Sequence, residues 1–487
     1  MTIRTRIAPS PTGYMHIGTL RTVMFDYFLA RQSGGQFVVR IEDTDQARLV
    51  PGALESLLAT FQKMGIDYDE GPVLQADGTI VEKGDYGPYV QSKRLDIYKP
   101  YVDQLVAAGD AYPCFCTRER LDEMRAAQTA AKQTPKYDRL CLKLSPTEVA
   151  AKLGAGESHV IRMKMPDGEV AFEDAIRGVI KFNLADSDDQ VILKSDGFAS
   201  YHLAVVVDDH LMKISHVLRG EEWISSTPKQ IVLHKMLGWK MPVYAHVPLI
   251  LNPDRTKLSK RKGDVSVEGY LNKGYLPEAL INFISTLGFN PTSDREIYTR
   301  AELVELFKLD KVNSGGAVMN TDKLDWMNNQ YLLKLADVEL VQLATPFLGE
   351  IAVTELVHRA LVVEKQRVNR LDEFAAKIQP YLATADYAKE ILVWKKTTPE
   401  DALEQLKNIR PVIAGLAGDT FAQIPLLEAA IKGYITDKGL QNGNVLWPLR
   451  VALSGAEKSA SPFECLWVLG QELSLTRIDK AIALLSA

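Results

Sequence analysis

The spacing of apolar residues predicts a strand, a loop and a helix at the start of the chain, followed by a second strand. A short apolar run ends near Ile7 and gives way to two prolines and a glycine. One face of the predicted helix is apolar, at i, i+3 and i+4 spacing, and consists of Leu20, Val23, Met24, Tyr27 and Phe28. Gly34-Gly35 would end the helix, and the second strand is expected over residues 37–41. In such a β-α-β unit the loop lies at the carboxyl end of a parallel strand, beside the amino end of the helix.

That loop runs into the tetrapeptide His16-Ile17-Gly18-Thr19, which could bind a phosphate. Free N–H groups and the helix dipole favour an anion at a helix amino terminus. Gly18 would let a nucleotide approach the backbone closely, and His16 could donate to a phosphate oxygen whose charge grows during a reaction. The alternative is an ordinary Pro/Gly turn with an incidental histidine.

A second stretch with candidate chemistry lies near the middle of the chain, where a strand-like run at 249–251 leads through a turn into a basic loop. Lys257 and Lys260 bracket Leu258-Ser259 there. Two lysines on such a loop could close over a triphosphate and neutralise charge that develops at its α-phosphorus. The alternative is a solvated run of charge. Taken together and in this order, the two stretches indicate ATP chemistry.

The remaining pattern separates the chain into a mixed part and a helical part. Helices are expected at 52–64, 95–108 and in a basic stretch at 118–132, with strand-like pieces at 160–165 and 179–182. The α/β pattern resumes near Leu193. From about residue 330 only helical spacing is found, over 332–343, 355–363, 402–409, 421–432 and 477–485. The sequence therefore predicts an α/β protein with an all-α carboxyl-terminal region.

Composition narrows the class of protein. At 487 residues the chain is too long for one typical core, so roughly two to four domains are expected. The formal charge of −5 excludes a globally basic nucleic-acid coat, although a local basic face could still hold RNA. No apolar run approaches the about 18 residues of a membrane helix, and the amino terminus has no signal-like stretch. A cytoplasmic protein without a membrane partner is the expectation.

Three of the four cysteines, Cys114, Cys116 and Cys141, lie close together in the sequence. In a reducing compartment such a group favours a metal site over a disulfide, and zinc takes four ligands in structural sites. The alternative is that these thiols are merely packed or free.

The paired motifs resemble those of the class I aminoacyl-tRNA synthetases, and within that class the chain looks like the bacterial glutamyl-tRNA synthetase family. The resemblance also covers residues 6–13, 40–45, 201–204, 207–210 and 219–223, in the family's order and across roughly the first half of the chain. The family motifs are usually written HIGH and KMSKS. Here Thr19 takes the place of the final histidine and the second motif reads Lys-Leu-Ser-Lys-Arg, two variants associated with the glutamyl enzymes.

The resemblance implies a class I Rossmann-like catalytic domain formed by residues 1–85 and 195–255, with an inserted acceptor-end-binding domain at 86–194. Residues 256–330 would form the KLSKR loop and a stem-contact domain. Residues 331–487 would form a helical anticodon-binding region of two subdomains, with a break near 395. Glutaminyl relatives end in β-barrels and the short tRNA-modifying relative lacks such a tail, so the helical tail favours the glutamyl enzymes. A monomer is expected.

The implied reaction is ATP-dependent activation of L-glutamate to glutamyl-adenylate and its transfer to tRNA(Glu), with Mg²⁺ accompanying ATP. His16, Lys257 and Lys260 would be the catalytic residues. The residues implied to bind ATP are Thr12, Gly18, Thr19, Glu222, Trp223, Leu258, Ser259 and Lys260. Two other classes remain open: a nucleotidyltransferase would have no use for the long tail, and a binding-only RNA paralogue would have lost motif residues that this chain keeps. Whether tRNA(Gln) is also charged stays open.

The glutamate site can be argued from charge. A substrate with two carboxylates and one ammonium needs two cationic groups and one anionic group, and arginine suits a carboxylate best. The residues implied to bind glutamate are Arg6, Ala8, Ser10, Glu42, Tyr201 and Arg219. By resemblance, Arg6 would meet the side-chain carboxylate, Arg219 the α-carboxylate and Glu42 the ammonium. Surface salt bridges are the alternative role for these charges. The family often carries a polar amide four residues after the tyrosine, where this chain has Val205.

The resemblance also bears on the cysteines and on the helical tail. Related proteins often have a histidine two residues after the last cysteine, where this chain has Lys143, and some use a tyrosine four residues before it. The preferred set of ligands for a structural zinc ion is therefore Cys114, Cys116, Tyr137 and Cys141. In the tail, Arg367 and Arg370 would read anticodon bases by planar hydrogen bonds, or would be solvated helix arginines.

Overall fold

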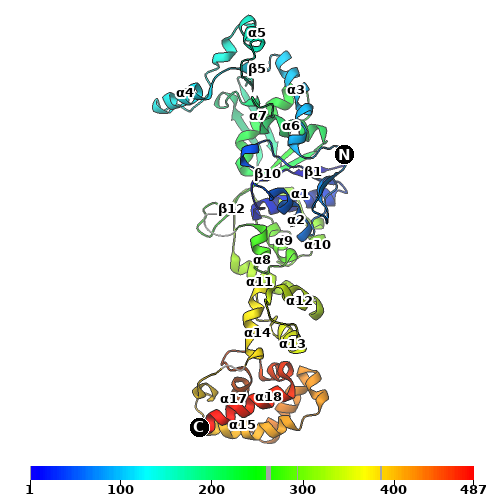
Figure 1. Cartoon of the computed structure of the whole chain (residues 1–487), viewed down its shortest axis with the longest axis vertical. Helices are drawn as coiled ribbons and strands as arrows, with labels where there is room; N and C mark the ends of the chain where they lie inside the picture. The colour runs from blue at the N-terminus through cyan, green and yellow to red at the C-terminus, as the bar shows by residue number, and fades with distance from the viewer. Residues whose placement is uncertain (1, 259–264, 293, 384–385) are drawn as a thin grey trace. The chain divides into compact units, whose positions relative to one another are not determined.

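The computed structural model describes residues 2–258, 265–292, 294–383 and 386–487, and the chain forms two compact units (Figure 1). The first comprises Met1–Tyr270 and Pro277–Thr321 and contains the strands of the described residues. The second comprises Leu271–Leu276 and Asp322–Ala487 and is helical. This confirms the predicted α/β class with an all-α carboxyl-terminal region. The finer four-part division stays a prediction.

The strands of the first unit form one four-stranded sheet and several smaller ones. The strands are β1 Arg4–Ile7, β2 Gln36–Val39, β3 Gly71–Leu74, β4 Ile80–Lys83, β5 Ala111–Cys114, β6 Val160–Met163, β7 Glu169–Asp174, β8 Gly178–Asn183, β9 Val191–Leu193, β10 His216–Gly220, β11 Val243–Val247, β12 Ile250–Leu251 and β13 Ala317–Val318. The larger sheet has the order β10-β11-β7-β8, in which β10, β11 and β7 are parallel and β8 is antiparallel to β7. Parallel strands gather their carboxyl ends at one edge, which is where α/β folds bind ligands.

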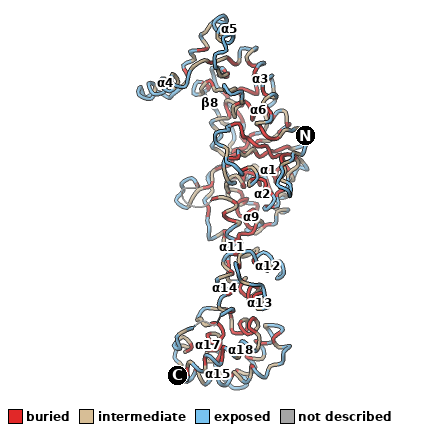
Figure 2. The backbone as a smooth tube through the Cα atoms, viewed as in Figure 1, coloured by how far each residue is buried: buried red, intermediate tan, exposed pale blue. Residues whose placement is uncertain are grey.

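Helices cover these strands. They are α1 Ile17–Gln32, α2 Ala53–Lys63, α3 Leu95–Ala107, α4 Arg118–Ala130, α5 Pro146–Gly154, α6 Tyr201–Leu211, α7 Thr227–Met236, α8 Val267–Asn272, α9 Pro277–Thr286 and α10 Arg300–Leu306. Buried residues dominate α1 and α6, whereas α4 and α5 have none (Figure 2). Among the described residues, no helix is both long and apolar enough to cross a bilayer.

The opening β-α-β unit has the predicted form. β1 and β2 are parallel, with Arg6 opposite Val38, and α1 connects them. The turn that follows α1 needs glycine twice: Gly34 has a φ of 63°, and a Cβ on Gly35 would lie 1.9 Å from the carbonyl oxygen of Ile3. β10 lies next to β1, because the amide of Ser215 donates to the carbonyl of Arg4 at 3.0 Å.

A network of buried charges joins these elements. Arg40, which follows β2, has no exposed surface and pairs with Asp209 at 2.7 Å and with Glu42 at 3.0 Å. Asp208 accepts from Arg94 Nε at 2.7 Å at the start of α3, and lies 3.7 Å from Arg40 Nε. Since an unpaired charge in the interior is costly, the network holds β2, α3 and α6 in one arrangement.

The second unit corrects three of the predicted helix boundaries. Its helices are α11 Thr321–Leu332, α12 Asp337–Ala344, α13 Glu355–Glu364, α14 Phe374–Leu382, α15 Pro399–Ala414, α16 Ile424–Asp437, α17 Asn442–Ser454 and α18 Pro462–Ser486. The start of the helix predicted over 332–343 is wrong, because α11 ends at Leu332 and α12 begins at Asp337, whose charge favours a first turn. The helix predicted from 421 begins at Ile424, where Pro425 suits the first turn. The helix predicted over 477–485 is the end of α18, which has a non-helical backbone at Gly470.

The buried charge network gives a testable prediction. Asp208→Ala should lower the free energy of unfolding by about 3–5 kcal/mol, because Arg94 then stays buried without its carboxylate. Urea titration followed by circular dichroism gives that value, and hydrogen exchange of α3 and α6 shows whether the loss is local. The matched control Asp103→Ala breaks an exposed pair with Lys99 and should change stability by less than about 1 kcal/mol. Similar losses in both variants would contradict the prediction.

Candidate active site

A cavity of about 760 Å³ opens at the carboxyl ends of β1 and β10, beside the amino end of α1. It gathers every predicted ATP- or glutamate-binding residue that the structure describes. The predicted residues along its wall are Arg6, Ala8, Ser10, Thr12, His16, Gly18, Thr19, Glu42, Tyr201, Arg219, Glu222, Trp223, Lys257 and Leu258. Ser259 and Lys260 lie outside the described residues. Residues far apart in the sequence of the first unit thus lie around one cavity.

His16 caps helix α1 with its side chain. Its Nδ1 accepts from the backbone N–H of Gly18 at 2.9 Å, and a Cβ at Gly18 would lie only 3.1 Å from that nitrogen. A neutral imidazole whose Nδ1 accepts must carry its proton on Nε2. The ring can therefore act as a donor, as the sequence predicts for His16.

Arg6 and Glu42 are both buried in the wall of the cavity. Arg6 Nε donates to Asp209 Oδ1 at 3.2 Å, and Arg6 Nη1 donates to the carbonyl of Leu218. Burial alone would lower the pKa of Arg6, but the Asp209 carboxylate raises it overall. Burial raises the pKa of Glu42, despite its bond from Arg40. A cationic ligand group beside Glu42 would favour its charged form.

Arg219 on β10 is also buried, but unlike Arg6 its hydrogen-bond partners are not carboxylates. Its guanidinium donates to His246 Nε2 at 3.0 Å, to the Tyr201 hydroxyl at 3.2 Å and to Thr227 Oγ1 at 2.8 Å. Two of these acceptors are hydroxyls and the third is an imidazole nitrogen, which accepts in the neutral ring. No carboxylate of the described residues forms an ion pair with Arg219. The cation at this wall of the cavity is therefore left without a counter-ion from the described part of the protein, which suits a site for an anionic ligand group.

Trp223 and Tyr201 form an aromatic side of the cavity, with ring centroids 4.5 Å apart. Val205, which stands where the family often has a polar amide, lies in the apolar core of α6 and is not part of the cavity wall. Sequence reasoning missed Asp174, Thr227 and His246, because none of them stands in a recognisable motif. Only the position of His246 within a strand that ends at the cavity could have drawn attention to it.

Lys257 is positioned by a tight hairpin. It bridges back to Leu251 at the end of β12, and the amide of Leu258 donates to the carbonyl of Ile250 at 3.1 Å. Leu258 is buried, and Arg255 adopts a φ of 61° in the turn between the two segments. The backbone thus brings the start of the basic loop to the cavity.

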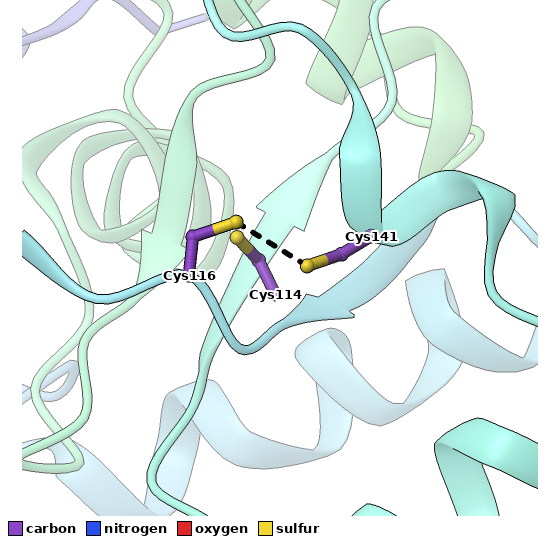
Figure 3. Close-up of side chains that lie close together, drawn as sticks. All are labelled: Cys114, Cys116 and Cys141. Atoms are coloured by element: carbon purple, nitrogen blue, oxygen red, sulfur yellow. Dashed lines mark hydrogen bonds between the residues drawn. The ribbon is translucent and has the colours of Figure 1, made fainter. Parts of the chain in front are cut away.

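The three cysteines predicted to bind a metal converge in space (Figure 3). Their sulfur atoms lie within 4.8 Å of one another, and Cys116 Sγ is 3.5 Å from Cys141 Sγ. The Tyr137 hydroxyl lies 3.3 Å from the sulfurs of Cys114 and Cys116. Tetrahedral zinc with Zn–S bonds of about 2.3 Å requires ligand atoms roughly 3.5–3.8 Å apart, and the three contacts of 3.3–3.5 Å in this cluster are close to that spacing. The side chain of Lys143 is exposed.

In the helical unit, Arg367 and Arg370 are engaged by acidic residues. Arg367 Nη2 donates to Glu464 at 2.8 Å. Arg370 pairs with three carboxylates, which are those of Asp325, Asp372 and Glu373. Reading of anticodon bases by these arginines stays a prediction, and it would require some of these ion pairs to open. The contacts favour a structural role over that of solvated helix arginines.

Comparison with known proteins agrees with this geometry. A family model described as the catalytic domain of class I tRNA synthetases (E and Q) matches residues 2–326, and one described as an anticodon binding domain matches residues 339–482. The chain is 41% identical to a glutamate–tRNA ligase of Clostridioides difficile (strain 630), with 98% of each chain covered. It is 44% identical to a glutamate–tRNA ligase of Dehalococcoides mccartyi (strain CBDB1), with 99% of this chain and 98% of the relative covered.

Solved structures give the same result. The chain is similar to a glutamate tRNA ligase from Elizabethkingia meningosepticum in complex with its amino acid, with a TM-score of 0.88, 32% identity and full coverage of both chains. It is also similar to a glutamate–tRNA synthetase from Elizabethkingia anophelis, with a TM-score of 0.86, 32% identity, and 99% of this chain and 100% of the other covered. The chain belongs to the class I tRNA synthetases of the E and Q family.

Proposed function

We propose that this enzyme is a glutamate–tRNA ligase, which activates L-glutamate with ATP and transfers it to the 3′ end of tRNA(Glu). The observation that carries the proposal is one cavity lined by two buried arginines, a buried glutamate and the amino end of helix α1. Relatives of nearly equal length that are more than 40% identical are named glutamate–tRNA ligases.

In the first step the α-carboxylate of glutamate attacks the α-phosphorus of ATP. A carboxylate O–P bond forms, the bond to the bridging oxygen breaks, and pyrophosphate leaves with its electron pair. In the second step a ribose hydroxyl of the terminal adenosine attacks the activated carbonyl and AMP leaves. Both nucleophiles belong to substrates, so the protein contributes positioning and stabilisation of charge.

The charges of the cavity match those of glutamate. Arg6 would bind the side-chain carboxylate, Arg219 the α-carboxylate, and Glu42 the ammonium. Ser10, Ala8 and the Tyr201 hydroxyl would complete the contacts. An arginine fork holds a carboxylate with two parallel bonds, which orients the attacking oxygen as well as binding it.

The ATP side of the cavity consists of the α1 terminus and the basic loop. Donors at the amino end of α1 and the Nε2–H of His16 would meet the phosphates, while Lys257 and Lys260 would offset charge at the α-phosphorus. Glu222 and Trp223 would border the adenosine. Mg²⁺ accompanying ATP would neutralise part of the phosphate charge.

The cysteine cluster would hold a structural zinc ion. Cys114, Cys116, Cys141 and Tyr137 would be its ligands, and such an ion would tie the end of β5 to the segment around 141. A closed site with four protein ligands leaves no position for a reacting water molecule, so its role would be stability.

The direct test is ATP–pyrophosphate exchange on purified protein with glutamate, with and without tRNA(Glu) or tRNA(Gln), and with glutamine as the competing amino acid. Exchange that depends on glutamate is expected, and the tRNA that supports it shows which acceptor the enzyme uses. Folded protein that gives no exchange with any of these combinations would refute the proposal and favour a binding-only paralogue.

Loss of the Lys257 charge should slow activation. Lys257→Ala is expected to lower kcat of exchange by about 100- to 1000-fold, because a preorganised donor to the developing phosphate charge is removed. Steady-state exchange at saturating ATP and glutamate measures this effect. Lys240→Ala, which removes an exposed lysine outside the cavity, should keep the parent rate. A parent-like rate in Lys257→Ala would rule out its catalytic role.

Zinc content tests the cysteine cluster. The purified protein is expected to hold about one zinc ion per chain by mass spectrometry, and Cys141→Ser should lose it. Tyr137→Phe should weaken zinc binding in competition with a chelator if the phenol is the fourth ligand. Cys465→Ala, at the one cysteine outside the cluster, should keep the ion. A protein without zinc when prepared without chelators would mean that these thiols are only packed.

A further inference from the structure

His246 lies directly beside Arg219 and Asp174 lies behind His246, yet neither is part of the cavity wall. His246 is on β11 and Asp174 ends the neighbouring strand β7, and both side chains have no exposed surface. His246 Nε2 is 3.0 Å from Arg219 Nε, and His246 Nδ1 is 2.6 Å from Asp174 Oδ2. Three parallel strands thus carry an uninterrupted chain of hydrogen bonds, from carboxylate to imidazole to guanidinium.

The donor and acceptor roles of Arg219 and Asp174 determine where the protons lie in this series of hydrogen bonds. An arginine Nε–H can only donate, so His246 Nε2 must accept and the ring must carry its proton on Nδ1. That proton is donated to Asp174, which also accepts from the backbone amides of Ile176 and Arg177 at 3.0 Å and of His246 at 3.1 Å. These bonds hold Asp174 as an anion and lower its pKa, although burial opposes this. Asp174 thereby fixes the tautomer of His246, while burial and the neighbouring Arg219 cation lower the pKa of its imidazole and favour the neutral ring.

The contact determines what Arg219 can offer to a ligand. Of its five N–H groups, Nε–H is taken by His246, one N–H on Nη1 by Tyr201 and one on Nη2 by Thr227. One N–H remains on each Nη nitrogen, so two donors are left for a ligand carboxylate. Because its other N–H groups are already bonded, the guanidinium is held in place before the ligand arrives, and binding costs less conformational entropy.

A neutral acceptor is essential to this arrangement. A carboxylate in direct contact with Arg219, as Asp209 is with Arg6, would offset the charge that the ligand needs. The imidazole instead orients Arg219 while the compensating anion, Asp174, stays one residue further away. The cation remains available to an anionic ligand.

We infer that His246, held in one tautomer by Asp174, is the positioning residue that fixes Arg219 for a carboxylate of the amino-acid substrate. The inference rests on the proposed function, in which glutamate is the amino-acid substrate. Sequence motifs do not include either residue. Asp174 belongs to the segment 86–194, which is predicted to bind the acceptor end. A residue outside both halves of the predicted nucleotide-binding fold would therefore help to position Arg219 in the amino-acid site.

Four variants test the inference by ATP–pyrophosphate exchange in the presence of tRNA. His246→Leu should raise KM for glutamate about 10- to 100-fold and leave KM for ATP unchanged, because the charged Arg219 loses its acceptor. His246→Gln should keep most of the affinity, since its Oε1 can stand near the place of Nε2. Asp174→Asn should resemble His246→Leu, because an amide donor toward Nδ1 would move the ring proton to Nε2, against the Arg219 Nε–H. In the His246→Gln background, Asp174→Asn should cause little further rise in KM for glutamate, because glutamine has no ring tautomer for Asp174 to fix.

The control is His234→Leu, which removes another buried histidine of the same unit, outside the cavity. It should change the melting temperature without a selective change in KM for glutamate. If His246→Leu does not fold, the comparison of Asp174→Asn with and without His246→Gln decides. Equal changes in both KM values, or additive effects in the double variant, would overturn the inference and leave a purely structural role. Absence of glutamate-dependent exchange in the parent enzyme would instead overturn the proposed function, and the inference with it.

Discussion

The pairing of three buried arginines with three buried carboxylates is the constraint on which the catalytic unit depends. The six residues are Arg6, Arg40, Arg94, Glu42, Asp208 and Asp209. They come from β1, from the segment after β2, from the start of α3 and from α6. Because isolated charges in a protein interior are far more costly than paired ones, the network forms only when all of these elements are in register. The same register places the ends of β1 and β10 around one cavity.

The two arginines of the cavity show two ways of burying a cation. Arg6 is held by a carboxylate and belongs to the network, so its charge is largely compensated within the protein. Arg219 is held by an imidazole, a phenol and a hydroxyl, and keeps its charge for a ligand. The two arginines would therefore present unequal uncompensated charge to a bound ligand.

Much of the fold and site could be predicted from the sequence, because the informative residues are local. Residues 7–41 show β-α-β spacing and the His16 motif directly, and the structure places these residues as expected. The residues behind Arg219 could not be predicted, since Asp174 and His246 meet only through strand pairing across a long stretch of chain. The break between α11 and α12 was missed for a related reason: apolar spacing continues across it, and only the new first turn at Asp337 marks it. Three of the five residues of the KLSKR motif, Ser259, Lys260 and Arg261, lie outside the described residues.

Strand β7 has a consequence for how freely parts of this protein could be exchanged. It pairs with β11 at Tyr244 and Asp174, and so joins the segment predicted to be inserted, 86–194, to the sheet that ends at the cavity. An insertion joined only at its two ends could be swapped among relatives as a cassette. Here a chimera that replaced this segment would also replace an edge of the shared sheet and the buried anion behind Arg219. Recognition of the acceptor end and of the amino acid would therefore have to evolve together rather than as separate modules.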